Sequence, residues 1–485
     1  MSQIGTHRKL MAVVAVVAAT AAAVPAQEST VEQLQELQEL RTEVGRRRAE
    51  LQRELRLLKQ VLGEEAEAGM VDYEQSLGGM SMEEVPAELR LLREDLQRVR
   101  DQLVQQQLGQ REERFAVSGE VRTRSEWNDA DFTSGAADLV QLMRSRVRVV
   151  GRPYILTRVI VELQDGRLWG EETSPSDAAG DAIDFHQAYV ELDEISNTAL
   201  GISLGRQELV YGNGRVVGAP SWSNQGRAFD AVRLKYGGAS RAELLYGKLK
   251  EKGVRDRNLY GLAGYLDRKR HHAEPYLLVE HDKGAGVDRL LRANLGLRAD
   301  GQEATATGHV FGYALEGILQ AGEAGGQDVL AYLAAASVNY SGPGWTRPRV
   351  DLGLDWLSGD DDPASGKRKA FDTLYGTRHG VLGLMDLFSD IPADTGQRGL
   401  ADFYLKGEMS ASEEVRLGLH VHHFALVEGT GNNLGQEADV VLTYQYNPAC
   451  TVSWGGLIFV PSDAMKATRG EDPAFKTYLQ TAVRF

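Results

Sequence analysis

Residues 141–150 read QLMRSRVRVV, and this stretch decides the fold class. Arg144, Arg146 and Arg148 occupy every second position, and small or apolar residues lie between them. Successive side chains of a β-strand point to opposite faces, so this spacing places the cations on one face and aliphatic groups on the other. The stretch therefore predicts a strand that separates a polar space from an apolar one.

The same two-residue period recurs throughout 115–485, where helical patterns disappear. Clear examples are residues 115–127, 154–164, 200–209, 228–236, 289–298, 349–357, 415–424, 438–446 and 475–485. Counting all such segments gives about 18 strands of roughly ten residues each, as in transmembrane barrels. We therefore predict an all-β fold, a transmembrane antiparallel β-barrel of about 18 strands over 115–485. A soluble β-sandwich or β-helix of a secreted protein is the alternative.

Short and long connections alternate between these segments. The tight turns include 151–153, 237–240 and 447–450, and the long polar connections include 166–183, 211–227 and 358–399. Short turns at one end and long loops at the other are typical of outer-membrane barrels. An even number of strands also places both barrel termini on the same side, which we expect to be the periplasmic side.

Composition excludes several other classes of protein. The 485 residues include 54 Lys and Arg against 69 Asp and Glu, and the resulting net charge of −15 argues against a nucleic-acid partner. A mean hydropathy of −0.33 excludes a polytopic helical membrane protein. The single cysteine, Cys450, excludes a disulfide framework and a zinc site built from cysteines.

Residues 1–26 have the features of a secretory signal peptide. Arg8 and Lys9 supply the positive start, the apolar stretch 10–24 follows, and small residues at 24–26 suit a cleavage site. We expect the mature chain to begin near Gln27. An N-terminal anchor helix is the alternative for this segment.

Residues 27–114 have the composition and spacing of a helical segment. The segment is rich in Glu, Gln, Arg and Leu, and apolar residues from Leu89 to Leu103 recur at intervals of three and four. This spacing predicts two helices, about 30–62 and 87–110, that form a short coiled coil. The coiled coil forms either an oligomer or an intramolecular hairpin. We expect this segment to lie in the periplasm, where it is able to bind a periplasmic or cell-wall partner.

The predicted strands carry cations on the face opposite their aliphatic residues. A charge on the lipid face costs about 2–4 kcal/mol at the membrane midplane, so these cations should face the lumen. The candidate pore-lining residues on the strands are Arg122, Arg124, Arg144, Arg146, Arg148 and Arg158. Inward arginines favour anionic solutes. Alternatively, these arginines pair with inward acids such as Glu120 and Glu162 and brace the wall.

The sequence gives little support for catalysis or for a bound cofactor. Hydrolase chemistry needs a nucleophile elbow between a strand and a helix, and the one G-x-S-x-G match, GISLG at 201–205, lies inside the alternating segment 200–209 instead. His420 and His422 share a strand face and are spaced to chelate a metal, but the sequence places no third ligand near them. We therefore predict no enzyme activity, no cofactor and no metal site.

Two blocks carry a family resemblance. The first runs from Gly205 to Asp230 and includes GRQELVYGNGR at 205–215, and the second includes WLSGDD at 356–361 and FDTLY at 371–375. Together they resemble the alginate-export family of outer-membrane porins over about 115–485. The resemblance implies an 18-stranded monomeric barrel that passes anionic polysaccharide through an arginine-lined pore narrowed by infolded loops. The constriction residues that it implies are Arg206, Arg215, Arg227 and Asp230.

The connection 211–227 combines aromatic and cationic residues, including Trp222. Such pairs hold sugar rings and their charged groups. We therefore expect at least one of the connections 211–227 and 358–399 to fold into the lumen. The alternative is that Trp222 packs on the barrel rim at the membrane interface.

These patterns lead to one functional prediction. We expect a passive outer-membrane channel for anionic or saccharide solutes, in contact with outer-membrane lipid, which exports an anionic polysaccharide such as alginate if the resemblance holds. One alternative is a trimeric general or phosphate-type porin. Another is an envelope tether, in which the coiled coil binds the cell wall and the barrel is only an anchor.

Overall fold

The computed structural model describes residues 114–132, 137–154, 156–170, 183–252, 255–282 and 290–485. The predicted signal peptide, and the predicted coiled-coil segment up to residue 113, lie outside the described residues. Among the described residues, no helix is long and apolar enough to cross a membrane.

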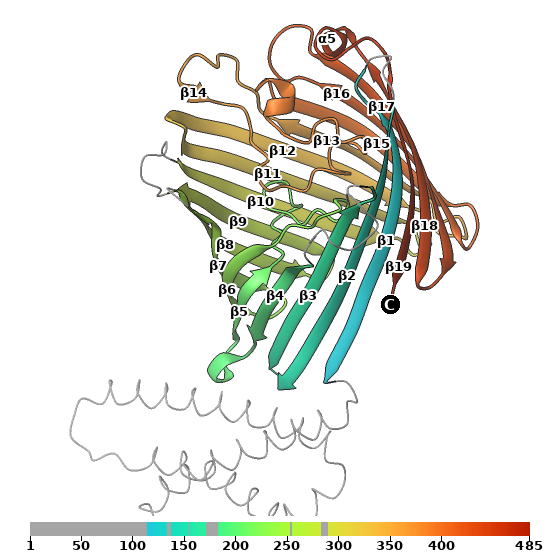
Figure 1. Cartoon of the computed structure of the whole chain (residues 1–485). Coiled ribbons are helices and arrows are strands. Elements are labelled where there is room, and N and C mark those ends of the chain that lie inside the picture. Colours follow the sequence, from blue (N-terminus) through green and yellow to red (C-terminus); the bar gives the residue numbers. More distant parts are fainter. Residues whose placement is uncertain (1–113, 133–136, 155, 171–182, 253–254, 283–289) are drawn as a thin grey trace, which may run out of the picture. The chain divides into compact units, whose positions relative to one another are not determined.

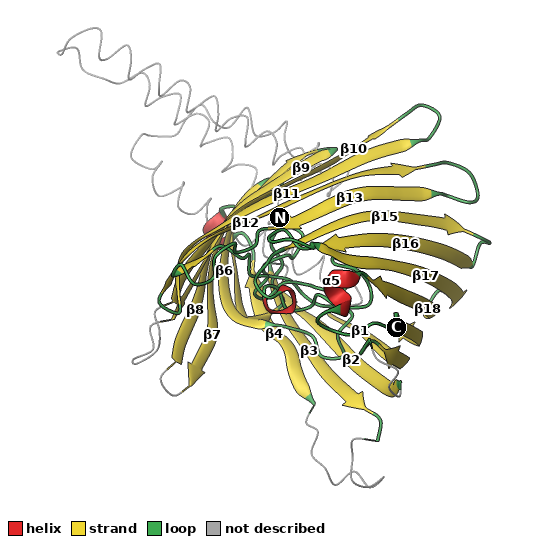
Figure 2. Cartoon of the chain, turned by 90° about the horizontal axis from the view of Figure 1, so that it is seen from above, coloured by secondary structure: helices red, strands yellow, loops and turns green. Residues whose placement is uncertain are grey.

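Eighteen antiparallel strands close into a barrel in the part of the chain that the structure describes (Figures 1 and 2). The first half of the barrel consists of β1 (Phe115–Asp129), β2 (Asp138–Tyr154), β3 (Thr157–Leu168), β4 (Asp184–Leu192), β5 (Leu200–Gln207), β6 (Phe229–Gly237), β7 (Arg241–Lys252), β8 (Arg255–Arg268) and β9 (His271–Asp282). The second half consists of β10 (Leu290–Ala304), β11 (Val310–Ala324), β12 (Gln327–Ser341), β13 (Arg349–Leu357), β15 (Leu400–Ser410), β16 (Val415–Ala425), β17 (Asn433–Asn447), β18 (Cys450–Pro461) and β19 (Ala474–Arg484). The predicted fold class and strand number of the barrel are confirmed.

Short elements lie in the connections. The two-residue strand β14 (Lys367–Arg368) pairs in parallel with β12 and is not part of the antiparallel ring. The other short elements are η3 (Ile195–Asn197), η4 (Ala393–Thr395) and α5 (Asp463–Lys466).

The first and last strands close the ring. β1 pairs with β19 in a register that sets Val121 opposite Val483, and β1 also pairs with β2. The last residue extends this pairing, because Phe485 and Gly119 exchange backbone hydrogen bonds of 3.1 and 2.8 Å. Closure leaves no free strand edge between β1 and β19, as a barrel in lipid requires.

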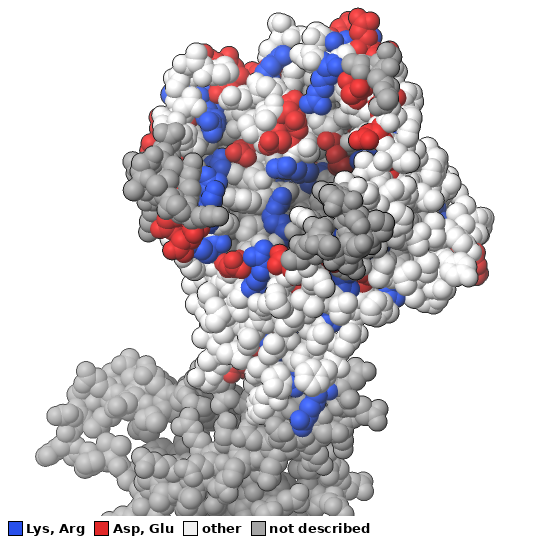
Figure 3. All heavy atoms as spheres, viewed as in Figure 1, with Lys and Arg blue, Asp and Glu red and all other residues white. Residues whose placement is uncertain are grey.

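Side chains alternate across the wall as the sequence predicts. On β1 and β2 the outward Val121 and Val147 are 42% and 41% exposed, whereas the inward Arg122 and Arg144 are 5% and 4% exposed. Figure 3 shows the charged side chains gathered around one end of the barrel, beside a band of uncharged residues. The outer face is therefore suited to lipid and the inner face is polar.

The connections divide by length between the two ends. The long connections 208–228 and 358–399 lie at the same end, which we call the loop end. The opposite end, which we call the turn end, has shorter connections such as 238–240 and 448–449, and there β1 begins and β19 ends.

The barrel strands find their partners within 115–485, so we expect the barrel to assemble without the preceding segment. A variant that joins residues 1–27 to Phe115 should reach the outer membrane and migrate as a compact band before heating and as an unfolded band after it. Gel mobility of outer-membrane fractions with and without heating checks this. A variant that never reaches the outer membrane would show that the division at 114 is wrong.

Candidate functional site

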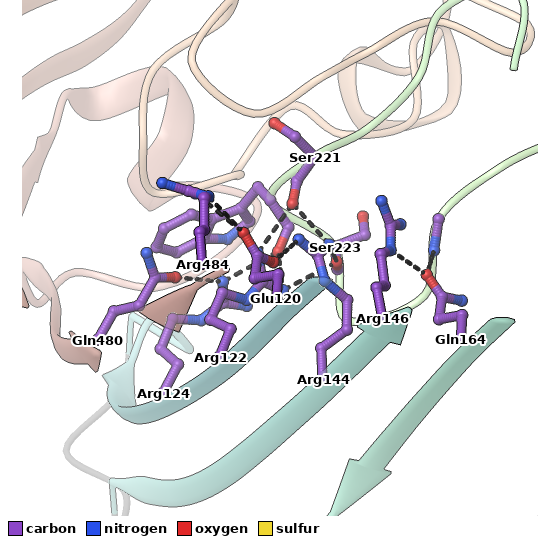
Figure 4. A network of polar contacts seen from close by, with 12 residues as sticks. Glu120, Arg122, Arg124, Arg144, Arg146, Gln164, Ser221, Ser223, Gln480 and Arg484 are labelled. Carbon is purple, nitrogen blue, oxygen red and sulfur yellow. Dashed lines mark hydrogen bonds and ion pairs between the residues drawn. The ribbon is translucent and has the colours of Figure 1, made fainter. Parts of the chain in front are cut away.

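The connection from β5 to β6, residues 208–228, folds into the barrel, and we call it the strap (Figure 2). Its tip, Ser221–Ser223, lies against the β1–β2 wall (Figure 4). Arg122 donates hydrogen bonds to the backbone oxygens of all three tip residues at 2.8–3.0 Å. Arg144 donates to the oxygens of Ser221 and Ser223, both at 2.9 Å, and Arg124 donates to that of Trp222 at 2.9 Å. Guanidinium groups of the wall therefore hold a run of carbonyl groups.

The other end of the strap binds a different part of the wall. Arg215 is buried between Glu316 of β11, at 2.9 Å, and Asp355 of β13, at 2.6 Å. Burial alone would lower the pKa of Arg215, but the two carboxylates outweigh burial and raise that pKa above its usual value. The Tyr211 hydroxyl donates to Glu243 of β7 at 2.7 Å. The strap thus crosses the lumen. Its tip offers carbonyl oxygens to wall arginines, whereas its other end offers Arg215 to wall carboxylates.

The connection from β13 to β15, residues 358–399, also folds inward, and we call it the inner loop (Figure 2). Tyr375 of the inner loop donates its backbone N–H to Val216 at 2.9 Å and accepts from Gly218 at 3.0 Å. Arg227 donates to the backbone oxygens of Tyr375 and Gly376. The strap and the inner loop therefore form one layer inside the barrel. The prediction that at least one long connection folds inward is confirmed for both.

The Trp222 ring packs against both the inner loop and the wall. Its ring stacks on that of His379, with centroids 4.0 Å apart and planes 6° apart, and the Arg124 guanidinium lies 3.7 Å from its centroid. Tyr478 meets the same ring edge-on at 4.9 Å. The alternative that Trp222 packs at the membrane interface is therefore wrong.

The stacking partner of Trp222 is held by a half-buried carboxylate. His379 contacts Asp386 at 2.9 Å, and Lys476 of β19 reaches the same carboxylate at 3.2 Å. Burial raises the pKa of Asp386, but the contacts with His379 and Lys476 outweigh burial and hold that pKa below its usual value. An ionised Asp386 thus links the inner loop to the wall next to the strap tip.

A cavity of about 530 Å³ lies beside the strap tip. Two glutamates line it against five arginines, which are Arg122, Arg144, Arg146, Arg148 and Arg484. Glu120 pairs with Arg144 at 2.6 Å and with Arg484 at 2.9 Å. Glu162 lies 3.6 Å from Arg146 and 3.7 Å from Arg148. The lining keeps a formal excess of positive charge, and we call this space the arginine cavity.

Two arginines that line the arginine cavity each have a buried donor without a hydrogen-bond acceptor. Arg144 Nε and Arg146 Nη2 are buried and lack a partner among the described residues. A buried donor without a partner costs free energy comparable to a lost hydrogen bond. The five lining guanidinium groups, with two carboxylates among them, offer donors to an anion in the cavity. The cavity is therefore suited to a carboxylate or phosphate group, the acceptors that guanidinium groups bind best.

The remaining predicted site residues have different roles. Arg158 pairs with Glu191 of β4 at 2.8 Å and braces the wall. Arg215 and Arg227 are engaged by wall carboxylates and by the inner loop, as described above. Glu316 and Asp355 were missed, because nothing in the sequence indicates which strands the strap will reach. Among the described residues, no group of three or more His, Cys, Asp or Glu is arranged to hold a metal ion.

Arg206 and Asp230 do not narrow the pore, and the expectation that they do is wrong. Arg206 lies two residues after the outward Leu204, and its strand partner Asp230 alternates with the inward Phe229 and Ala231. Both side chains therefore point away from the lumen, where they form an exposed ion pair of 3.2 Å. They lie at the loop end of their strands, away from the midplane, where an outward charge costs little.

Comparison with known proteins adds to this geometry. A family model described as alginate export matches residues 114–478, whereas no curated protein matches the chain. The structure of OccK11 (OpdR) of Pseudomonas aeruginosa is 10% identical, with a TM-score of 0.53 over 76% of this chain and 96% of that chain. OccAB4 of Acinetobacter baumannii is 8% identical, with a TM-score of 0.53 over 76% of this chain and 98% of that chain. At such identities these two likenesses concern the fold.

Removing the buried guanidinium should destabilise the barrel far more than removing the outward one. Arg215→Ala leaves Glu316 and Asp355 as unpaired buried charges, so we expect a loss of about 3–5 kcal/mol. The matched control, Arg206→Ala, breaks an exposed pair and should cost at most about 1 kcal/mol. Urea unfolding of both variants, followed by gel mobility, measures the difference. Equal losses would contradict the buried role of Arg215.

Shortening the strap should widen the channel. Replacing 213–225 with a short Gly-Ser linker removes the segment that crosses the lumen, so single-channel conductance should rise about two-fold or more, since a barrel of this size encloses an aqueous channel. Planar-bilayer recordings check this, with heat-dependent gel mobility as the control for folding. Unchanged conductance in a folded variant would show that the strap does not limit ion flow.

Proposed function

Because this chain belongs to the alginate export family and is an outer-membrane β-barrel channel, we propose that it conducts anionic or saccharide solutes passively across the bacterial outer membrane. The observation that carries the proposal is the arginine cavity, in which two glutamates line the wall against five arginines. Clefts of one charge sign raise the local concentration of oppositely charged solutes. The proposal includes no catalytic step.

The lining arginines that do not bind the strap tip support a preference for anions. Arg146 and Arg148 share Glu162 at 3.6 and 3.7 Å, distances longer than those of a direct hydrogen bond. The Arg148 side chain is 40% exposed and reaches the open part of the cavity. An entering carboxylate or phosphate therefore meets guanidinium groups that neighbouring acids neutralise only in part.

Solute size separates two forms of the proposal. The strap and the inner loop share the lumen, and both faces of the Trp222 ring are covered by His379 and Arg124. A compact anion needs only the arginine cavity. An anionic polysaccharide such as alginate needs the strap to move before a sugar ring can stack on Trp222. At rest, the compact cavity thus favours small anions, as in a phosphate-type porin. A polymer passes only after the strap has moved.

The orientation and partners form part of the same proposal. The turn end would face the periplasm, with residues 27–114 on that side after cleavage of residues 1–26. The outward aliphatic face would contact outer-membrane lipid, and residues 27–114 would be free to bind a periplasmic or cell-wall partner.

Anion preference should depend on the lining arginines that do not bind the strap tip. In Arg146→Gln/Arg148→Gln the anion-to-cation permeability ratio should fall roughly two-fold or more, because the cavity loses most of its excess charge. Reversal potentials in asymmetric potassium chloride measure this ratio. Arg206→Gln removes an outward charge and should leave the ratio unchanged. If the double variant keeps the wild-type ratio, the arginine cavity does not select anions.

A further inference from the structure

Arg122 and Arg144 take part both in the arginine cavity and in the attachment of the strap tip. Both line the arginine cavity, and both hold the strap tip through the backbone oxygens of Ser221 and Ser223. These contacts are 2.8–3.0 Å long, which is ordinary for an N–H donor and a carbonyl acceptor. An anion in the cavity therefore lies next to the same guanidinium groups that fix the strap.

The strap oxygens are the weaker class of acceptor. A hydrogen bond from a guanidinium to an oxyanion is shorter and stronger than one to a neutral carbonyl, and a carboxylate or phosphate engages the guanidinium fork with two oxygens. The side chains of Ser221 and Ser223 are exposed, so water can solvate the tip once its carbonyl groups are released. Arg122 and Arg144 exchange carbonyl oxygens for anionic ones, and Arg124, which loses the Trp222 oxygen, keeps Gln480 and Glu126 as partners.

We propose that an anionic solute in the arginine cavity displaces the strap tip from Arg122 and Arg144 and so opens the channel for its own passage. The solute would carry at least two anionic oxygens, because it must replace the oxygens of Ser221 and Ser223 as acceptors for both guanidinium groups. It binds the displaced state better than the resting state, because displacement frees further guanidinium donors. That difference in affinity shifts the population toward the open state.

The base of the strap stays in place during this exchange. Arg215 is held by two carboxylates at 2.6 and 2.9 Å and lies away from the arginine cavity. An anion would have to replace charged acceptors there rather than neutral ones, and it would leave two buried acids unpaired. Movement is therefore confined to the tip, with Trp222 leaving its stack on His379.

The inference rests on the proposed function, and one set of recordings tests both. The full-length protein is placed in planar bilayers, and sodium phosphate replaces sodium chloride at constant ionic strength. Single-channel conductance should rise about two-fold as phosphate saturates the cavity. A second arm uses short guluronate oligomers, whose carboxylates offer the same chemistry on a saccharide. A rise with phosphate alone assigns the exchange to small anions, and a rise with both extends it to polymer carboxylates.

Arg122→Gln tests the contact itself, since this substitution removes three hydrogen bonds to the strap tip. Its conductance in chloride should already be raised, and phosphate should add less than in the wild type. Arg241 is the matched control, because its guanidinium stacks on Tyr265 at 3.9 Å and touches neither the strap nor the arginine cavity. Arg241→Gln should respond to phosphate as the wild type does.

Tryptophan fluorescence provides a test that does not depend on whether Arg122→Gln folds. The difference in acrylamide quenching between wild type and Trp222→Phe reports the exposure of Trp222, and it should increase when phosphate is added. Conductance that only falls with phosphate, together with unchanged quenching, overturns the displacement while leaving an anion-selective channel intact. Reversal potentials without anion preference overturn the proposed function itself.

Discussion

Lipid on the outside of the barrel forces nearly every charge of the strands to the inside, and the lumen must then supply partners for those charges. The β1–β2 wall has more guanidinium groups than carboxylates, whereas Glu316 and Asp355 on β11 and β13 are acids that need a cation. The strap supplies partners to both, because it presents carbonyl oxygens to the β1–β2 wall and Arg215 to the two acids. Its path across the lumen follows from this uneven distribution of charge.

The fold was largely predictable because alternation is a local property. The spacing of Arg144, Arg146 and Arg148 indicates which face is polar, and the same rule repeated along 115–485 predicts the strand number. Partners are not local. Whether a lumen arginine meets an acid, a carbonyl or solvent depends on strand register and on where an inward loop touches the wall. The sequence therefore placed Arg122 in the lumen without indicating that the strap would occupy it.

In the candidate site too, the sequence pattern predicted which residues face the lumen but not which groups they contact. Aromatic and cationic residues in one connection predicted an inward strap, and Trp222 does lie in the lumen. The error at Arg206 and Asp230 arose because their role was taken from a motif rather than from strand alternation. Leu204 is outward, so the residue two positions later is outward too. Where a motif and the two-residue period disagree inside a barrel strand, the period decides, because lipid enforces it.

The two attachments of the strap differ in how easily they exchange partners. Arg215 is neutralised by two buried carboxylates, and removing either acceptor would leave charge uncompensated in a dry site. The tip is held by neutral carbonyl groups whose loss water can compensate, beside a cavity that five arginines and two glutamates line. Charged carboxylate partners therefore make the Arg215 end permanent. Neutral carbonyl acceptors make the tip exchangeable. Carboxylates at the tip would have neutralised the arginines and removed the attraction for anions, so the neutral acceptors fix the strap while preserving the charge of the cavity.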